Sequence, residues 1–85
     1  MIKKTVVVKL KTGLRARPAA LFVQEANRYS SEIMVEREDK RVNAKSIMGI
    51  MSLAINTGAE ITIIADGSDE QQAVENLTEL LSKEE

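Results

Sequence analysis

Two arginines precede an apolar helical pattern in the segment KTGLRARPAALFVQ, residues 11–24. Arg15 and Arg17 lie at the start of the predicted helix, where free N–H groups and the helix dipole favour an anion. Two guanidinium groups there can hold a phosphate or a carboxylate through paired hydrogen bonds. Because arginine keeps its proton near neutral pH, the pair cannot act as a base or a nucleophile. The segment therefore predicts either anion binding without catalysis or two solvated surface arginines.

A serine occupies a helix-capping position in a second segment, NAKSIMGIMSL, residues 43–53. Ser46 precedes a short apolar helix, and its hydroxyl oxygen is suited to accept a hydrogen bond from a free backbone N–H group. Capping alone explains a serine at this position. A phosphate on the hydroxyl would also be stabilised by the helix dipole and by the free amides of the first turn. Ser46 is therefore a candidate phosphorylation site.

The helix after Ser46 contains more apolar residues than one buried face needs. At 100° per residue, the face expected to be buried carries Ile50, Leu53 and Ala54. A second face, expected to be exposed, carries Ile47, Met48 and Met51. Exposed methionines form adaptable apolar surfaces that bind partners, whereas the alternative is ordinary core packing. The first of these interpretations places a docking surface beside the candidate phosphorylation site.

The composition excludes most kinds of catalytic centre. The 85 residues contain no cysteine and no histidine, so disulfides, thiolate metal sites and catalysis by a thiol or an imidazole are excluded. The acidic residues Asp66, Asp69 and Glu70 cluster near a turn but lack the spacing of a metal-binding loop. The sequence has no Gly-rich phosphate loop and no Ser/His/Asp set. We therefore expect a protein that is not an enzyme and uses no metal and no cofactor.

The charge is distributed unevenly along the chain. Residues 1–45 contain 11 Lys/Arg and 5 Asp/Glu, a balance of +6, whereas residues 46–85 contain 1 and 8, a balance of −7. The net charge of −1, with one Tyr and one Phe, argues against direct nucleic-acid binding; a domain that binds RNA or DNA through its basic half is the alternative. No apolar run can span a membrane and no signal-peptide pattern is present, so we expect a cytoplasmic protein without membrane contact.

Seven elements are expected in one domain of residues 1–85. Period-two patterns predict strands at 5–10, 32–37, 41–42 and 60–66. Helices are expected from about Arg17-Pro18, over 45–55 up to Thr57-Gly58, and after Ser68, which forms a predicted capping box with Gln71. The apolar stripes of the first and last helices are Ala19, Phe22, Val23 and Ala26, and Ala73, Val74, Leu77, Leu80 and Leu81. This β-α-β-β-α-β-α order favours an α+β open-faced sandwich, a four-stranded antiparallel sheet covered on one face by three helices.

The segments TGLRARPAALFVQ and NAKSIMGIMSL resemble the active-site and regulatory-serine segments of the HPr family, phosphocarriers of the bacterial sugar phosphotransferase system. The resemblance covers essentially the whole chain, including the order of its elements. In HPr proteins the position of Arg15 holds the histidine that accepts phosphate from Enzyme I, so this chain is not expected to carry phosphate there. The branch of the family that acts in catabolite repression also lacks the histidine and keeps the serine, although it usually has a glutamine at that position.

The resemblance implies that HPr kinase/phosphorylase phosphorylates Ser46 and that the phosphorylated form is a corepressor of the LacI-type catabolite control repressor. It implies that partner-binding residues are Arg17, Ala20, Leu21, Lys45, Ile47, Met48 and Met51. Members of this branch are associated with dimers, and the loop at Gly13 would permit exchange of the first strand, so we expect a monomer–dimer equilibrium. The alternatives are a phosphotransferase-system carrier with another acceptor and an inactive variant of a carrier with Arg15.

Overall fold

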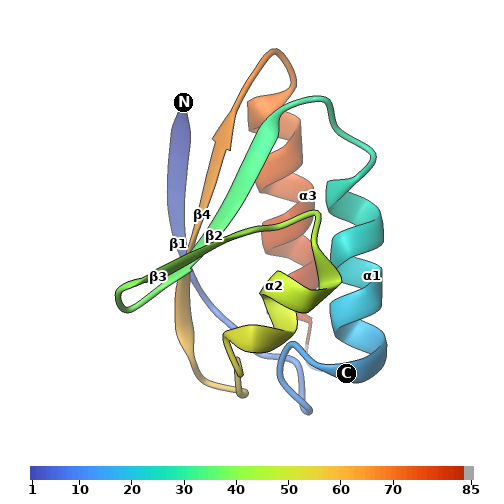
Figure 1. The fold of residues 1–85 in the computed structure, drawn as a ribbon, viewed down its shortest axis with the longest axis vertical. Helices are drawn as coiled ribbons and strands as arrows, with labels where there is room; N and C mark the ends of the chain where they lie inside the picture. The colour runs from blue at the N-terminus through green and yellow to red at the C-terminus, as the bar shows by residue number, and fades with distance from the viewer. Residues whose placement is uncertain (84–85) are drawn as a thin grey trace.

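The computed structural model describes residues 1–83. Its elements, in chain order, are β1 (Ile2–Val7), α1 (Ala16–Ala26), β2 (Glu32–Arg37), β3 (Lys40–Asn43), α2 (Ile47–Ser52), β4 (Glu60–Asp66) and α3 (Glu70–Ser82). The four strands form one antiparallel sheet in the order β1-β4-β2-β3, which leaves β1 and β3 at its edges. Figure 1 shows the three helices on the same side of the sheet. The predicted α+β open-faced sandwich is confirmed.

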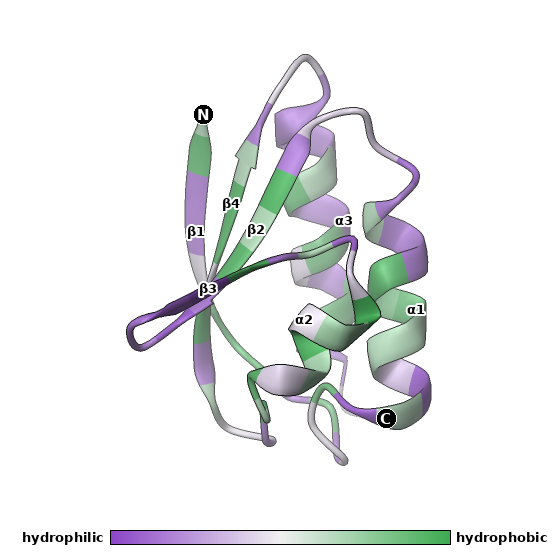
Figure 2. Cartoon of the chain, viewed as in Figure 1, coloured by the Kyte–Doolittle hydropathy of each residue, from purple (hydrophilic) through white to green (hydrophobic). Residues whose placement is uncertain are grey.

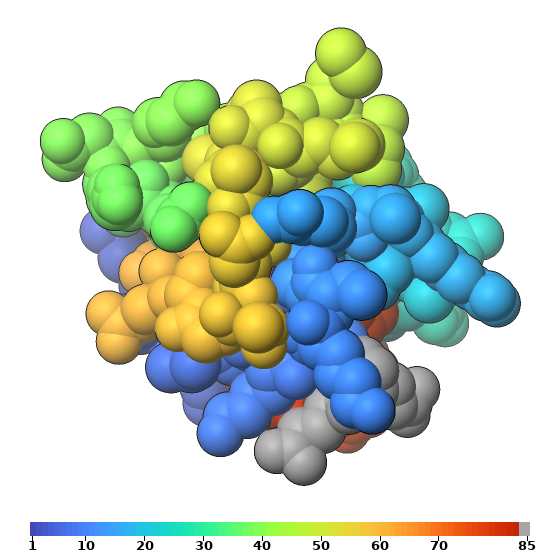
Figure 3. Space-filling view, turned by 90° about the horizontal axis from the view of Figure 1, so that it is seen from below, coloured from blue at the N-terminus to red at the C-terminus, as the bar shows by residue number. Residues whose placement is uncertain are grey.

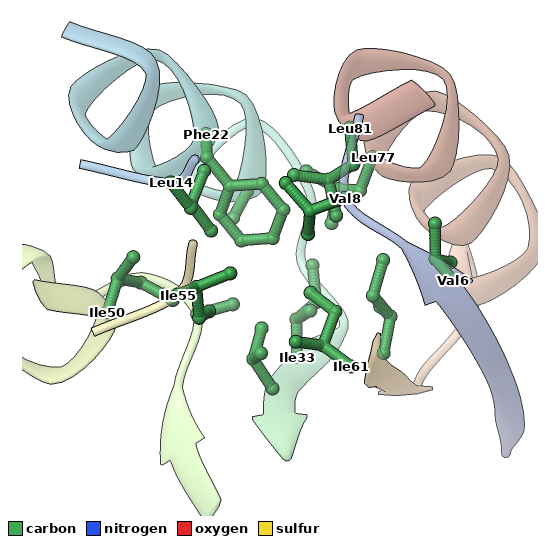
Figure 4. Close-up of a cluster of buried hydrophobic side chains, with 14 of the residues drawn as sticks. Val6, Val8, Leu14, Phe22, Ile33, Ile50, Ile55, Ile61, Leu77 and Leu81 are labelled. Carbon is green, nitrogen blue, oxygen red and sulfur yellow. The ribbon is translucent and has the colours of Figure 1, made fainter. Parts of the chain in front are cut away.

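The core lies between the sheet and the helices. Alternate residues of the central strands, Ile33 and Val35 on β2 and Ile61 and Ile63 on β4, face the helices and are buried, as period two predicts. The ring of Phe22 extends from α1 into this cluster, with Leu14 beside it (Figure 4). Figure 2 shows the corresponding apolar bands on β2 and β4. The core thus fixes α1 against the strands and sets where its first turn lies.

The first strand begins and ends earlier than the predicted range 5–10. Val7 pairs with Glu60, the first residue of β4, so the ladder has no further partner beyond it. The chain nevertheless stays close to the sheet, because the Val8 N–H donates to the Ala59 carbonyl at 2.9 Å. Val6, Val8 and Leu10 are all buried, which confirms the predicted apolar face. The strand β3 and its turn lie within two residues of the prediction.

The helix α1 begins at Ala16, next to the predicted start near Arg17-Pro18. Ala16 has a φ of +54°, a left-handed conformation, so regular helical geometry starts at Arg17. Pro18 is the third residue of the helix and not the first, but its missing N–H still falls among the four that have no partner within a helix. Ala19, Phe22 and Ala26 are buried and Val23 is half-buried, as the apolar spacing predicts.

The helix α2 is shorter than the predicted range 45–55. It ends at Ser52, and just beyond it the carbonyl oxygens of Leu53 and Ala54 accept hydrogen bonds from the Arg37 side chain on β2, at 2.9 and 3.1 Å. Ala54 has a φ of +50° and turns the chain out of the helix. Ile50 and Leu53 are buried as expected, whereas Ala54 is exposed, so its placement on the buried face was wrong. Gly58 adopts the predicted left-handed conformation, with a φ of +87°.

The predicted capping box of Ser68 and Gln71 is wrong. Asp69 occupies the N-cap position of α3, and its side chain makes no hydrogen bond to the helix's own amides. Its carboxylate instead accepts hydrogen bonds from the backbone N–H groups of Ser30 and Ser31, at 2.9 and 3.0 Å, and from the Ser31 hydroxyl. The start of α3 is therefore held by a segment 38 residues earlier in the chain. The predicted stripe is correct: Ala73, Val74, Leu77 and Leu81 are buried and Leu80 is half-buried.

Candidate functional site

The first turn of α1 presents two exposed arginines. Arg15 is the N-cap residue, in an extended conformation, and its side chain makes no capping hydrogen bond. Its Nη2 atom donates instead to the Oδ1 atom of Asn56, in the loop between α2 and β4. Arg17 is exposed, and the first turn contains no acidic residue. This end of the helix is therefore positively charged and lacks a side chain with a lone pair suited to accept a phosphoryl group.

The loop before α1 packs against the loop after α2. The Leu14 N–H donates to the Ile55 carbonyl at 2.9 Å. Gly13 has a φ of +72°, and a Cβ atom there would lie 2.4 Å from the Ile55 carbonyl oxygen. Figure 3 shows the two segments in contact, the first in blue and the second in gold. Arg15 therefore follows a loop that is hydrogen-bonded to the segment after α2 and packed closely against it.

Ser46 caps α2 as predicted. Its Oγ atom accepts a hydrogen bond from the Gly49 N–H at 3.1 Å, and its backbone is extended. The residue is half-buried, so the hydroxyl lies at the edge of the molecular surface. The first turn of α2 contains no acidic residue that would repel an added phosphate. The position therefore suits a group with negative charge.

Lys45, directly before Ser46, fixes this segment to the end of α1. Its ammonium group donates to the Tyr29 carbonyl at 2.7 Å. The Asn27 side-chain amide donates to the Lys45 carbonyl at 3.4 Å. Burial raises the pKa of the Tyr29 hydroxyl, which donates to Glu25 Oε2 at 2.8 Å. The structure thus shows Lys45 in an internal hydrogen bond, and its role in partner binding stays a prediction.

The apolar side chains predicted to bind partners lie on two helices that pack side by side. Ile47, Met48 and Met51, here called the α2 surface, are exposed, which confirms the predicted exposed face. On α1, Ala20 and Leu21 are also exposed. Leu21 and Arg17, however, line a groove between α1 and α3, whose other walls include Leu10, Pro18, Leu80 and Lys83. Leu21 and Arg17 thus form part of the wall of this groove, and their role in partner binding stays a prediction.

Three residues that support the site carry no local sequence signal. Asn56 accepts a hydrogen bond from Arg15, the Tyr29 carbonyl accepts one from Lys45, and Arg37 donates one to Leu53 at the end of α2. Each acts on a residue that is 16 to 41 positions away along the chain. Their roles follow from packing and cannot be found from periodicity or from a motif.

The acidic cluster near α3 has structural partners. Asp69 binds Ser30 and Ser31, as described above, and Glu70 Oε1 accepts the Gly67 N–H at 3.0 Å. Within residues 1–83 no group of three or more His, Cys, Asp or Glu side chains is arranged to hold a metal ion. Over the same residues, no helix has the length and apolar character needed to cross a membrane.

The fold and the two segments define the class of protein. The family described as "PTS HPr component phosphorylation site" matches residues 2–83, so the chain belongs to the HPr family. The HPr-like protein Crh of Halalkalibacterium halodurans is 64% identical over 84 residues, which are 99% of this chain and 100% of that protein. The predicted family resemblance is confirmed.

Two solved structures show how this chain compares with both branches. The phosphocarrier HPr of Bacillus anthracis is 59% identical, with a TM-score of 0.94 over 95% of this chain and 96% of that one. Crh of Bacillus subtilis, solved as an intertwined dimer with a swapped domain, is 60% identical, with a TM-score of 0.78 over 99% of this chain and 97% of that one. High similarity to both means that fold alone does not separate a carrier from a regulator, and the site residues must do so.

Proposed function

We propose that this chain is a regulatory HPr-like protein of carbon catabolite repression and not a phosphocarrier. The observation that carries the proposal is the pairing of Arg15 at the carrier position with Ser46 as the cap of α2. Arg15 has no lone pair for attack on phosphorus, whereas Ser46 presents a hydroxyl at a helix end that stabilises negative charge. The chain is thus a substrate and a binding partner for other proteins, acting in the cytoplasm, and is not itself an enzyme.

HPr kinase/phosphorylase is proposed to phosphorylate Ser46 at Oγ. The added phosphate brings about −1.5 to −2 charges to the first turn of α2 at pH 7. Its oxygens can take over the hydrogen bond that the Gly49 N–H now donates to Oγ. Because the helix is already formed and held at both ends, the modification adds a charged group to a fixed surface without refolding the domain.

The phosphorylated form is proposed to bind the LacI-type catabolite control repressor as its corepressor. The α2 surface places exposed apolar side chains next to the phosphate. Aliphatic and methionine side chains of this kind form protein–protein interfaces. Arg17, Ala20 and Leu21 extend the contact over α1, and Lys45 holds the phosphorylated segment in place. Arg17 offers a guanidinium group for an acidic side chain of the repressor.

A homodimer formed by exchange of β1 is part of the proposal. β1 is an edge strand that pairs only with β4. When β1 moves to a second copy, the β1–β4 hydrogen bonds within one chain are lost, and the same hydrogen bonds form between the two chains. The swapped dimer of Bacillus subtilis Crh supports this arrangement. Light scattering over a range of concentrations tests it: an average mass that rises with concentration is expected, and a constant monomer mass would contradict it.

Incubation with purified kinase and ATP, followed by intact-mass analysis, tests the modification. One phosphoryl group is expected on the wild type and none on Ser46→Ala. Ser52→Ala is the matched control, because Ser52 is an exposed serine of the same helix. A phosphate mapped to another residue would overturn the proposal. The phosphorylated protein should then bind the repressor more tightly than the unmodified protein.

The alternative is a phosphotransferase-system carrier, or an inactive variant of one. Incubation with Enzyme I and phosphoenolpyruvate distinguishes the two functions. An acid-labile phosphoryl group on the wild type would support the carrier, whereas its absence, together with kinase-dependent modification of Ser46, supports the regulator.

A further inference from the structure

Two thioethers are the most exposed apolar groups of α2. Met48 is 77% exposed and Met51 is 51% exposed. They lie three residues apart, so both side chains project from the same side of the helix. Neither belongs to the buried core cluster or to the partly buried residues packed against it. Met34, on β2, is half-buried and provides an internal comparison.

The composition makes these thioethers the main targets of oxidants. The chain contains no cysteine, no histidine and no tryptophan, and its one tyrosine, Tyr29, is 9% exposed. Methionine oxidises readily, and its rate depends on access of the oxidant to the sulfur. An oxidant that reaches this protein therefore meets the α2 surface and Met1, which lies 70% exposed at the chain end near Asp66 and Glu70.

We propose that Met48 and Met51 form an oxidation site at which hydrogen peroxide converts the α2 surface from apolar to polar and so weakens corepressor binding. The second half of this inference rests on the proposed function. A lone pair of the methionine sulfur attacks one oxygen of the peroxide, an S–O bond forms and the O–O bond breaks. The proton on the sulfur-bound oxygen passes to the departing hydroxide, which leaves as water, and the sulfoxide remains. The sulfur loses two electrons and the peroxide gains them, so no further reactant is needed.

The sulfoxide acts on the interface and not on the fold. It is a polar group and a strong hydrogen-bond acceptor, which is unfavourable when buried against an apolar partner without a donor. Because the Met48 and Met51 side chains stand outside the core, the added oxygen atoms displace no packed atoms. The thermal midpoint of unfolding should therefore stay the same while affinity for the repressor falls at least tenfold. Methionine sulfoxide reductases with a thiol reductant can reverse the change.

The reactivity order tests the site without any partner. The protein is treated with dilute hydrogen peroxide, digested and mapped by mass spectrometry over time. Met48 and Met1 should gain oxygen first, Met51 next and Met34 last. Met34→Leu is the control variant and should keep the fast additions. Oxidation of Met34 at the rate of Met48 would overturn the inference.

Repressor binding by Ser46-phosphorylated protein, before and after peroxide, tests the consequence. The wild type and Met34→Leu should both lose at least tenfold in affinity and regain it after reductase treatment. For the double variant Met48→Leu/Met51→Leu, the affinity after peroxide is compared with its own affinity before peroxide, and the two should be equal. Equal loss in the double variant, or no loss in the wild type, would overturn the inference. If the untreated phosphorylated wild type fails to bind, the proposed function and the regulatory consequence fall together, while the reactivity order still decides the site.

Discussion

The guanidinium group of Arg37, on β2, donates a hydrogen bond of 2.9 Å to the carbonyl oxygen of Leu53, immediately beyond α2. The same nitrogen also donates to Ala54 at 3.1 Å. A helix of six residues has few internal hydrogen bonds and is unstable by itself. The cap at Ser46 and the contact with Arg37 therefore hold α2 from opposite ends, and so determine how the α2 surface is presented.

Replacement of Arg37 should loosen α2. Arg37→Met leaves the carbonyl oxygens of Leu53 and Ala54 without their hydrogen-bond donor. We therefore expect the free energy of unfolding to fall by about 1 kcal/mol. Urea denaturation measures the loss, and hydrogen exchange should quicken at the α2 amides. Arg41→Met is the control, because the Arg41–Glu36 pair at 3.3 Å is exposed and should contribute less than about 0.5 kcal/mol. Equal effects of the two substitutions would contradict the role of Arg37.

The cap at Ser46 should tolerate aspartate better than alanine. Ser46→Ala removes the acceptor of the Gly49 N–H, and we expect a loss of about 1 kcal/mol in the free energy of unfolding. Ser46→Asp retains an oxygen acceptor and adds a negative charge near the positive end of the helix, so its loss should be smaller. Thermal or urea unfolding gives the comparison. Similar losses for both variants would show that the hydrogen bond contributes little.

Alanine substitutions at two glycines separate the cost of backbone strain from the cost of a steric clash. Gly13→Ala forces a Cβ atom to within 2.4 Å of the Ile55 carbonyl oxygen at a φ of +72°, so we expect a loss of about 2 kcal/mol or more. Gly58→Ala meets no atom within 4 Å and carries only the strain of its φ of +87°, about 1 kcal/mol. Urea unfolding of the two variants measures the difference. A larger effect at Gly58 would contradict the close packing of the two loops.

Acid should weaken the contact between Asp69 and the Ser30–Ser31 segment. The hydrogen bond from the Ser31 hydroxyl, followed by those from backbone N–H groups, holds the pKa of the Asp69 carboxyl below its ordinary value of 3.8. A lowered folded-state pKa means that the stabilisation is complete above the unfolded-state value and is lost as the pH falls through the folded-state value. The wild type should therefore lose stability below about pH 4.

Asp69→Asn tests this assignment, because it removes the titrating group while keeping similar size. Its free energy of unfolding should be lower than that of the wild type at pH 7, and the difference should shrink as the pH is lowered to 2 to 3. Asp39→Asn, in the exposed turn between β2 and β3, is the control and should follow the wild-type pH profile. A constant difference for Asp69→Asn over the whole pH range would contradict the assignment.

A histidine at position 15 should restore the chemistry that Arg15 lacks. Arg15→His supplies an imidazole with a lone pair at the start of α1, beside Arg17 and the free N–H groups of the first turn. Enzyme I and phosphoenolpyruvate should then place an acid-labile phosphoryl group on the variant and none on the wild type. Mass analysis at alkaline pH detects it. A variant that folds but stays unmodified would show that more than Arg15 separates this chain from a carrier.

The local features of the chain were determined by the sequence alone. The order of the elements, the buried stripe of α3 and the cap at Ser46 depend on residues within a few positions of one another, where periodicity and capping chemistry act. The absence of histidine, with Arg15 before the first helix, was equally plain from composition and motif. These features were enough for the fold class and for the family.

Tertiary structure decided where those features end and what they touch. Arg37 binds the carbonyl of Leu53 at the end of α2, 16 residues away, and Asp69 accepts hydrogen bonds from Ser31, 38 residues away. Arg15 reaches Asn56, and Leu21 lines a groove between α1 and α3. Each outcome depends on how whole elements pack, because a side chain forms hydrogen bonds with the donors and acceptors that folding brings near it, however distant they are along the chain.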